Sequence, residues 1–214
     1  MPALITGPDG ALKYLIAPMV VYNSFVGTRG TLNLFRYEPG RKELKGLASW
    51  SERIERKFLL SYVDPGFSNG RYSIGASATH FKNATLRFFG LGPTTAKRDQ
   101  TNYTASETRA NWKFGVYAND VTQLALSQRL RHMQPIQQGV TELPFTGDTF
   151  PNVPGVEGAT ILGQHDSIHY NTRDNLITPT DGAAITAYAE LNYNLRNRDN
   201  PLYSRYELEV KKLF

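Results

Sequence analysis

The sequence contains no cysteine among its 214 residues, and this absence removes several classes of chemistry. Disulfide cross-links, thiolate metal sites and cysteine nucleophiles are all excluded. The absence leaves the compartment open, because cytosolic chains and chains that cross an oxidising periplasm both use little cysteine.

Long hydrophobic runs are also missing from the sequence. Mean hydropathy is −0.41, and no window approaches the ~18 consecutive apolar residues that a membrane-spanning helix requires. The first residues carry no cation before Lys13 and no apolar segment followed by a small-residue cleavage site, so they do not predict a secretory signal. We therefore expect a chain without transmembrane helices, which either stays inside the cell or starts downstream of its natural beginning.

Charge of one sign is not concentrated anywhere in the chain. The 24 Lys and Arg against 19 Asp and Glu give a net charge of +5, and the charges often alternate with apolar residues. Nucleic-acid-binding surfaces gather their cations in one stripe, so no nucleic-acid partner is expected. The abundant residues are 12 Tyr, 11 Phe and 18 Gly, a balance that favours aromatic-rich strands over helices.

Apolar and polar residues alternate with the period of a β-strand in many segments. In residues 71–81 the even positions are mostly apolar and the odd positions are mostly small or polar, which places the two sets on opposite faces of a strand. This alternation predicts about ten strands of a length close to the ~9–11 residues of a tilted membrane strand. Clear cases are residues 71–81, 107–117, 123–131, 183–196 and 202–211, and weaker ones are residues 13–22, 30–37, 43–51, 57–63 and 159–170.

The connections between these strands differ in length. Residues 83–102 and 134–158 form long connections, whereas the turns near Pro39, Pro65 and Asp120 are short. Outer-membrane barrels place short turns on the periplasmic side and long loops outside. No internal repeat, low-complexity tract or second domain is evident, so residues 1–214 are interpreted as a single domain.

Two architectures fit this pattern: a soluble antiparallel sandwich or barrel, and a membrane barrel. The apolar faces are rich in Ala, Gly and aromatics rather than the bulky Ile and Val of a sandwich core, and the polar faces carry both charge signs, as a wide aqueous lumen would. A weaker signal is that Tyr and Trp recur near strand ends, as in the aromatic girdles of membrane barrels. These residues are Tyr14, Tyr22, Tyr37, Trp50, Tyr103, Trp112 and Tyr193.

Two motifs resemble those of a known family. Residues 87–95 (RFFGLGPTT) with 101–103 resemble the aromatic-aromatic-Gly-x-Gly loop and following strand of the bacterial surface antigen barrels, the BamA and TamA family of outer-membrane proteins. Residues 151–155, 169–175 and 179–182 are similar to that family's Tyr-Asp-Thr-Arg-Asp-Asn…Pro-x-x-Gly region, with Asn171 where the family usually has Asp. The motif residues are Phe89, Gly90, Gly92, Tyr170, Thr172, Arg173, Asp174, Asn175, Pro179 and Gly182.

The resemblance runs from about residue 13 to the end and carries expectations for the whole chain. It implies an all-β, antiparallel transmembrane β-barrel in the bacterial outer membrane, with about ten strands of an expected sixteen, so that the chain is expected to be a partial barrel. It implies a non-enzymatic role in outer-membrane protein assembly or secretion, with membrane lipid and unfolded outer-membrane proteins or secreted clients as partners. A passive pore, a soluble ligand-binding β-barrel and a barrel fused to a separate hydrolase domain stay open as alternatives.

The candidate sites indicate structure more than catalysis, and no cofactor is expected. Gly90 and Gly92 lack the third glycine and helix of a dinucleotide fingerprint. His165 and His169 share a strand face but lie roughly 13 Å apart, and Asp166 points to the other face, so this run alone forms neither a metal site nor a hydrolase triad.

Thr172-Arg173-Asp174-Asn175 is interpreted as a turn at the periplasmic rim, where Arg173 and Asp174 pair and Asn175 accepts turn amides. A further set of charges is expected to face the lumen, either in cross-strand ion pairs or as determinants of transport selectivity. These charges are Glu107, Arg109, Lys113, Arg129, Arg131, Glu190, Arg205 and Glu207, with Arg196 and Glu209 beside them.

Overall fold

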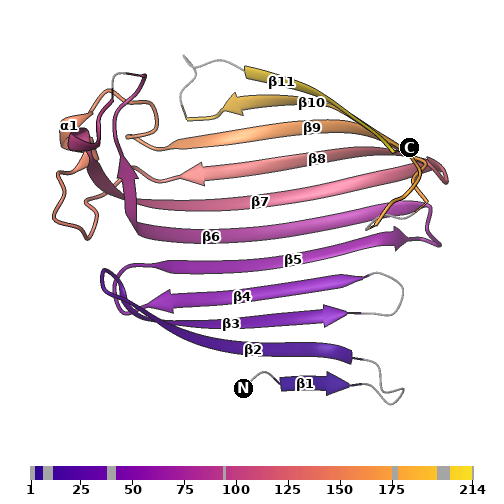
Figure 1. The fold of residues 1–214 in the computed structure, drawn as a ribbon, viewed down its shortest axis with the longest axis horizontal. Coiled ribbons are helices and arrows are strands. Elements are labelled where there is room, and N and C mark those ends of the chain that lie inside the picture. Colours follow the sequence, from indigo (N-terminus) through magenta and orange to yellow (C-terminus); the bar gives the residue numbers. More distant parts are fainter. Residues whose placement is uncertain are drawn as a thin grey trace.

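A computed structural model describes residues 3–6, 12–37, 42–93, 95–174, 178–196 and 203–213. These residues form one antiparallel sheet of 11 strands, in which the spatial order of the strands equals their order in the sequence (Figure 1). The strands are β1 (Ala3–Thr6), β2 (Leu12–Asn23), β3 (Gly27–Tyr37), β4 (Glu43–Ser51), β5 (Arg56–Phe67), β6 (Tyr72–Phe88), β7 (Thr101–Asn119), β8 (Thr122–Met133), β9 (Ala159–Asn171), β10 (Gly182–Asn194) and β11 (Tyr203–Leu213).

In the part of the chain that the structure describes, helical structure is confined to two short turns, η1 (Lys97–Asp99) and α1 (Thr146–Thr149). Within the described residues, no helix combines the length and the apolar character needed to cross a membrane. The prediction of an all-β antiparallel architecture is therefore confirmed.

The ten predicted segments correspond to β2–β11, each paired with its sequence neighbours. The additional strand, β1, pairs with β2 from Ala3 opposite Ile16 to Thr6 opposite Leu12. Four residues are too few for an alternation test, so the sequence did not predict this strand. Among the described residues, β1 and β11 form the two edges of the sheet and do not pair with each other.

The long connection predicted over residues 83–102 is wrong in extent, because β6 continues to Phe88 and β7 begins at Thr101. The pairing shifts register between Asn83 and Leu86 and then resumes. Asn83 Oδ1 accepts hydrogen bonds from the Thr85 backbone N–H at 2.9 Å and the Thr85 hydroxyl at 3.0 Å. This local turn forms a bulge that breaks the alternation of side chains, so the strand resembled a loop in sequence.

The long connection over residues 134–158 is confirmed and has a definite structure. β8 ends at Met133 opposite Glu107, and the connection covers the part of β7 that extends further. The Asn102 N–H donates to the Pro144 carbonyl at 2.9 Å, and the Thr104 N–H donates to the Gln137 carbonyl at 2.7 Å. Pairing of this kind satisfies backbone groups that a longer strand leaves exposed.

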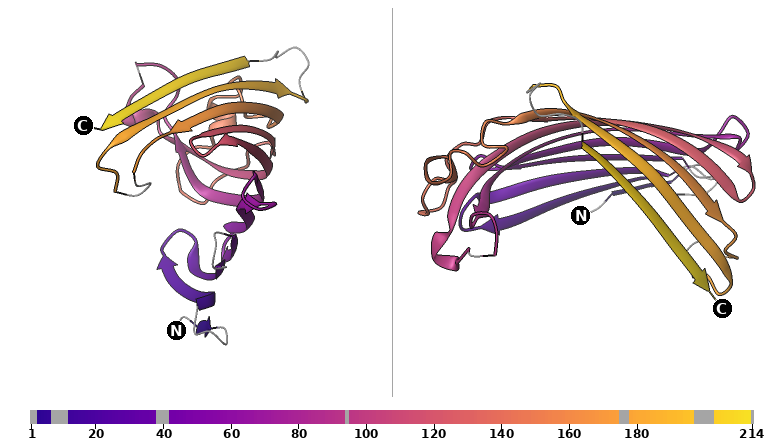
Figure 2. Two further views of the ribbon diagram at one scale, coloured as in Figure 1. Left: turned by 90° about the vertical axis from the view of Figure 1, so that its right-hand side faces the viewer. Right: turned by 90° about the horizontal axis from the view of Figure 1, so that it is seen from above.

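The sheet is twisted and curved (Figure 2), and its two faces differ in character. Among the described residues, the buried hydrophobic residues are only Val26, Ala84, Ala125 and Ala159. Large apolar side chains instead stand exposed on one face, which we call the apolar face. It includes Leu60 (59% exposed), Trp112 (43%), Leu124 (47%), Ile168 (52%) and Leu208 (69%). An apolar surface this extensive is far larger than the patches that soluble monomers expose.

Candidate functional site: the polar face of the sheet

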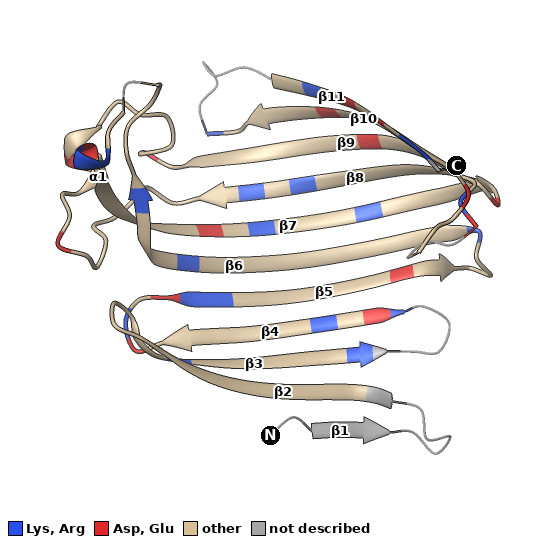
Figure 3. Ribbon diagram, in the orientation of Figure 1, with Lys and Arg blue, Asp and Glu red and all other residues tan. Residues whose placement is uncertain are grey.

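The predicted lumenal charges all lie on the face opposite the apolar one, which we call the polar face. Cross-strand register establishes this placement: Arg109 lies opposite Arg131, and Glu190 lies opposite Arg205. His165 of β9 shows that the charges of β7–β8 and those of β10–β11 share this face, because it lies opposite Ser127 of β8 on one side and opposite Glu190 of β10 on the other. The charged positions on β7 and β8 therefore stand in neighbouring rows (Figure 3).

Glu107 is the centre of the first charged group. Its side chain is 5% exposed and accepts two hydrogen bonds from Arg131, from Nε at 2.7 Å and from Nη2 at 2.8 Å. Arg109 Nε also donates to the same carboxylate. A bidentate arginine–carboxylate contact is among the stronger ion pairs, so the cross-strand pairing that the sequence suggested is present here.

A second group centres on Glu190 and reaches across an intervening strand. Arg129 Nη1 lies 3.8 Å from Glu190 Oε1, and Asn192 Nδ2 donates to the same oxygen at 3.1 Å. Gly163 of β9 lies between Arg129 and Asn192 in register. A Cβ atom at position 163 would lie 2.8 Å from the Asn192 Oδ1 atom. The absence of a side chain at Gly163 therefore leaves room for Arg129 and Glu190 to approach each other across β9.

A third group lies at the β11 edge. The Tyr188 hydroxyl and Arg205 Nη2 each donate to Glu207 Oε2 at 2.6 Å. The Tyr188 ring also packs on His165, with 4.5 Å between ring centroids. The eight predicted charges thus fall into paired groups, apart from Lys113, which has no carboxylate partner among the described residues.

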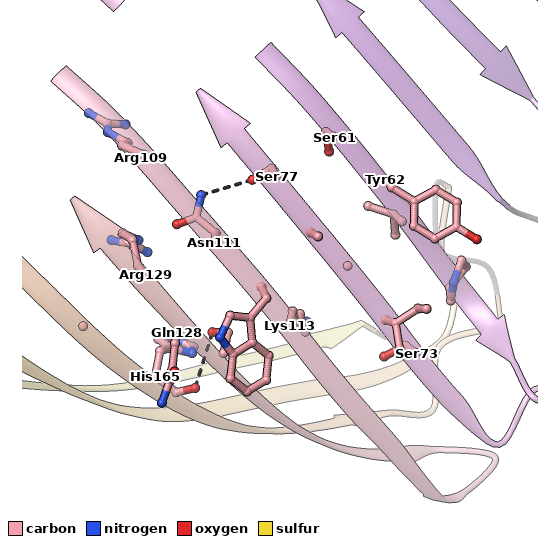
Figure 4. A pocket seen from close by; sticks show the side chains of 18 of the residues that line it. Ser61, Tyr62, Ser73, Ser77, Arg109, Asn111, Lys113, Gln128, Arg129 and His165 are labelled. Atoms are coloured by element: carbon pink, nitrogen blue, oxygen red, sulfur yellow. Dashed lines mark hydrogen bonds between the residues drawn. The ribbon is translucent and has the colours of Figure 1, made fainter. Parts of the chain in front are cut away.

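A hollow of about 750 Å³ lies on the polar face beside these groups (Figure 4). Small side chains line it, including Ser61, Ser73 and Ser77 with Gly75. Asn111 Nδ2 donates to Ser77 Oγ at 3.1 Å, and the cations Arg109, Lys113, Arg129 and Arg131 also line the hollow. The arrangement offers water-accessible polar groups with an excess of positive charge.

The turn between β9 and β10 is organised by Asp174. Its Oδ1 atom accepts from the backbone N–H groups of Thr180 at 3.0 Å and Asp181 at 3.2 Å, and Oδ2 accepts from the Thr180 hydroxyl at 2.6 Å. Arg173 Nε donates to Asn171 Oδ1 at 2.9 Å, rather than pairing with Asp174 as predicted. Asp174 accepts the turn amides that the sequence assigned to Asn175, which lies outside the described residues.

The other motif residues have conformational roles. Gly182 has φ of +102°, and a Cβ there would lie 2.5 Å from the Thr172 carbonyl oxygen. Gly90 and Gly92 also have positive φ, +97° and +95°, as expected for a bend in the loop after β6. Phe89 stands exposed in this loop, Pro179 is half-buried in the turn, and Tyr170 lies on the apolar face.

The sequence matches the family model of the Omp85 superfamily domain over residues 40–213. The chain belongs to the Omp85 superfamily. The match includes both motifs and every strand from β4 to β11, and it confirms the predicted family resemblance. A search of curated proteins gives no match. The superfamily is associated with the bacterial outer membrane and, in general, with outer-membrane protein assembly and secretion.

The histidines of β9 hold separate positions in this Omp85 domain. His165 and His169 lie on the polar face and Asp166 lies on the apolar one, as the alternation predicted. His169 contacts Ser167 Oγ at 3.0 Å and Thr186 Oγ1 at 3.3 Å. The described part of the domain contains no cluster of three or more His, Asp or Glu side chains suited to a metal ion.

A polar ladder interrupts the apolar face of the Omp85 domain, and sequence reasoning missed it. Gln128 Nε2 donates to Gln164 Oε1 at 2.9 Å, and Gln164 Nε2 donates to Asp166 Oδ1 at 2.7 Å. The signal was available as three polar residues at even positions of otherwise apolar strands. Because isolated amides and carboxylates are costly to place against hydrocarbon, their mutual hydrogen bonds reduce that cost.

Proposed function

We propose that the chain forms part of an outer-membrane β-barrel that assists the assembly of other outer-membrane proteins or secretion across that membrane. The observation that carries the proposal is the Omp85 match over residues 40–213. The exposed apolar face supports it, since such a face suits contact with lipid. Its partners are membrane lipid and unfolded client proteins, and the proposal includes no enzymatic activity.

The physical route is the addition of a client strand to an edge of the sheet. β1 is short, Ala3–Thr6, and among the described residues it pairs with β2 alone. An edge strand presents unpaired N–H and C=O groups, and an incoming extended segment satisfies them by β-augmentation. In the membrane this gives a client strand backbone partners that lipid cannot supply.

Proteoliposomes that contain the full polypeptide test this proposal. We expect them to accelerate the folding of an added, urea-unfolded outer-membrane β-barrel protein, compared with liposomes that contain an ordinary porin. Adjacent N–H groups of a strand point to opposite edges. Of the two variants Leu4→Pro and Ile5→Pro, one therefore removes an N–H donor from the open edge of β1, and the other removes an N–H donor from the edge that pairs with β2. Both variants should slow client folding, whereas Leu4→Ala should retain the acceleration. Equal client folding with wild-type protein and with porin would contradict the proposal.

The second candidate is a passive pore, and the excess of cations beside the hollow favours it. A pore of this kind owes its ion preference to lumenal charges such as Arg129. Planar-bilayer recordings separate the candidates, because a pore predicts channels whose anion preference falls in Arg129→Ala. Silent bilayers, together with accelerated client folding, support the assembly role.

A further inference from the structure

The apolar face has a polar boundary on the side of the long connections. His80, Thr108, His132 and Thr160 lie opposite one another on β6–β9. His80 Nδ1 and Thr108 Oγ1 are 2.9 Å apart, and His132 Nδ1 and Thr160 Oγ1 are 2.8 Å apart. On β8 and β9 the exposed side chains of Leu130 and Leu162 lie immediately beyond this row, which therefore marks one margin of the lipid-facing band.

Two cations occupy paired backbone positions on neighbouring strands just outside this margin. Arg56 of β5 lies directly opposite Lys82 of β6, on the same face as His80. Like charges directly opposite in a sheet destabilise it. Arg56 Nη1 donates to the carbonyls of Ser51 at 3.0 Å and Glu55 at 2.8 Å, so its described contacts bring no negative charge.

Carboxylates do not neutralise this cation pair within the described part of the chain. Lys82 Nζ donates to the amide oxygen of Gln137 at 3.3 Å. The carboxylate of Glu55 lies 3.7 Å from Arg29 instead. Glu52, in the same turn, interacts with Thr28, and that hydrogen bond lowers the pKa of its carboxyl. The two cations thus differ from Arg109 and Arg131 of the polar face, which share Glu107.

Exposed aromatic side chains flank the cation pair. Trp50 lies opposite Arg56 and is 52% exposed, with its ring over Gly30, where a Cβ would lie 3.7 Å away. Phe58 is 43% exposed and stacks on His80 with 6.4 Å between ring centroids. Tryptophan beside cations at the margin of an apolar band is typical of the membrane–water interface.

We propose that Arg56 and Lys82 bind the phosphate group of an anionic lipid headgroup. A phosphate between them replaces repulsion with two attractive contacts, and a guanidinium group suits phosphate geometry. The exposed rings of Trp50 and Phe58 favour a lipid over a free phosphate, because they offer apolar contact to the attached acyl chains. The inference rests on the membrane placement in the proposed function and is independent of assembly activity.

Quenching of tryptophan fluorescence by brominated lipids tests this site. The chain has two tryptophans, Trp50 and Trp112. In the Trp112→Phe variant of this 214-residue chain, Trp50 is the single tryptophan reporter. This chain is reconstituted in phosphatidylcholine vesicles with increasing fractions of brominated phosphatidic acid, and separately of brominated phosphatidylcholine. The ratio of the two quenching curves gives the relative affinity for phosphatidic acid near Trp50. We expect at least a threefold preference for phosphatidic acid.

Charge-removing variants identify the residues responsible. Arg56→Gln with Lys82→Gln should reduce the preference to about one, whereas the swap Arg56→Lys with Lys82→Arg should retain it. Lys57→Gln is the matched control, because Lys57 is the next residue but lies on the polar face opposite Phe81, and it should leave the preference unchanged. In the Trp50→Phe variant, quenching of Trp112 should show little preference for phosphatidic acid, since Trp112 lies within the apolar band.

The outcomes separate this inference from the proposed function. Quenching of Trp50 by both lipids without preference, or a preference that persists in the double Gln variant, would overturn the phosphate site while leaving the membrane placement intact. Loss of the preference on adding inorganic phosphate, but not chloride at equal ionic strength, would overturn the assignment to lipid. Absence of quenching by either lipid would contradict the membrane placement itself, and the site with it.

Discussion

At the scale of residues, alternation predicted which face each charged side chain occupies but not its partner. Glu107 and Arg131 are recognisable in sequence as polar-face residues. Their bidentate contact depends on the register between β7 and β8, in which Arg109 lies opposite Arg131. Periodicity within one strand contains no information on its offset from the next. For the same reason the Gln128–Gln164–Asp166 ladder escaped prediction.

The Glu107 group makes a testable contribution to stability. Glu107→Gln leaves Arg109 and Arg131 without their shared carboxylate, so we expect a loss of about 1–3 kcal/mol in the free energy of unfolding, as for loss of a charged hydrogen-bond partner in a buried setting. The measurement is urea unfolding from lipid vesicles. Glu209→Gln is the matched control: its pair with Lys211 is exposed at both side chains, and we expect a change of less than about 1 kcal/mol. Equal losses in both variants would contradict the distinction.

At the scale of elements, long strands with clear alternation were predictable and irregular ones were not. β8 and β10 were recognised because apolar and polar residues alternate along them. β6 and β7 were predicted too short, since the bulge after Asn83 reverses the alternation, and Thr101–Ser106 pairs with β6 on one side but with the 134–158 connection, not with β8, on the other. The turn at Asp174 was predicted in place but not in hydrogen bonding, because side-chain acceptors compete for the same amides.

The close contact between the 134–158 connection and β7 gives a second prediction. A Cβ at Gly139 would lie 2.6 Å from the Asn102 side-chain carbon Cγ and 3.0 Å from the Ala84 carbonyl oxygen. Gly139→Ala should therefore loosen this contact by about 1–3 kcal/mol, the usual cost of overpacking. Hydrogen exchange at the Asn102 and Thr104 amides should accelerate roughly tenfold or more. Gly66→Ala, where only a side-chain oxygen at 4.0 Å is near, should leave their exchange unchanged; equal effects of both variants would contradict the packing account.

At the scale of the whole molecule, the antiparallel order and the family were accessible from sequence. Aromatic-Gly-x-Gly and Thr-Arg-Asp motifs identified the resemblance, and the Omp85 match over residues 40–213 confirms it. The curvature of the sheet and the hollow on its polar face depend on the cumulative twist of many strands, which no single segment encodes. The biological role follows from neither twist nor alternation, so it is a proposal that rests on family membership.

The central claim is that the apolar face of this sheet meets lipid and the polar face meets water. The absence of cysteine from this chain makes single-cysteine spin labelling at each residue from 124 to 131 on β8 the most direct test, with the 214-residue chain in lipid bilayers. We predict that accessibility to oxygen, which concentrates in hydrocarbon, peaks at even positions such as Leu124, Leu126 and Leu130. Accessibility to a water-soluble nickel complex should peak at odd positions such as Arg129 and Arg131. Uniform accessibility along β8, or the opposite phase, would contradict the claim.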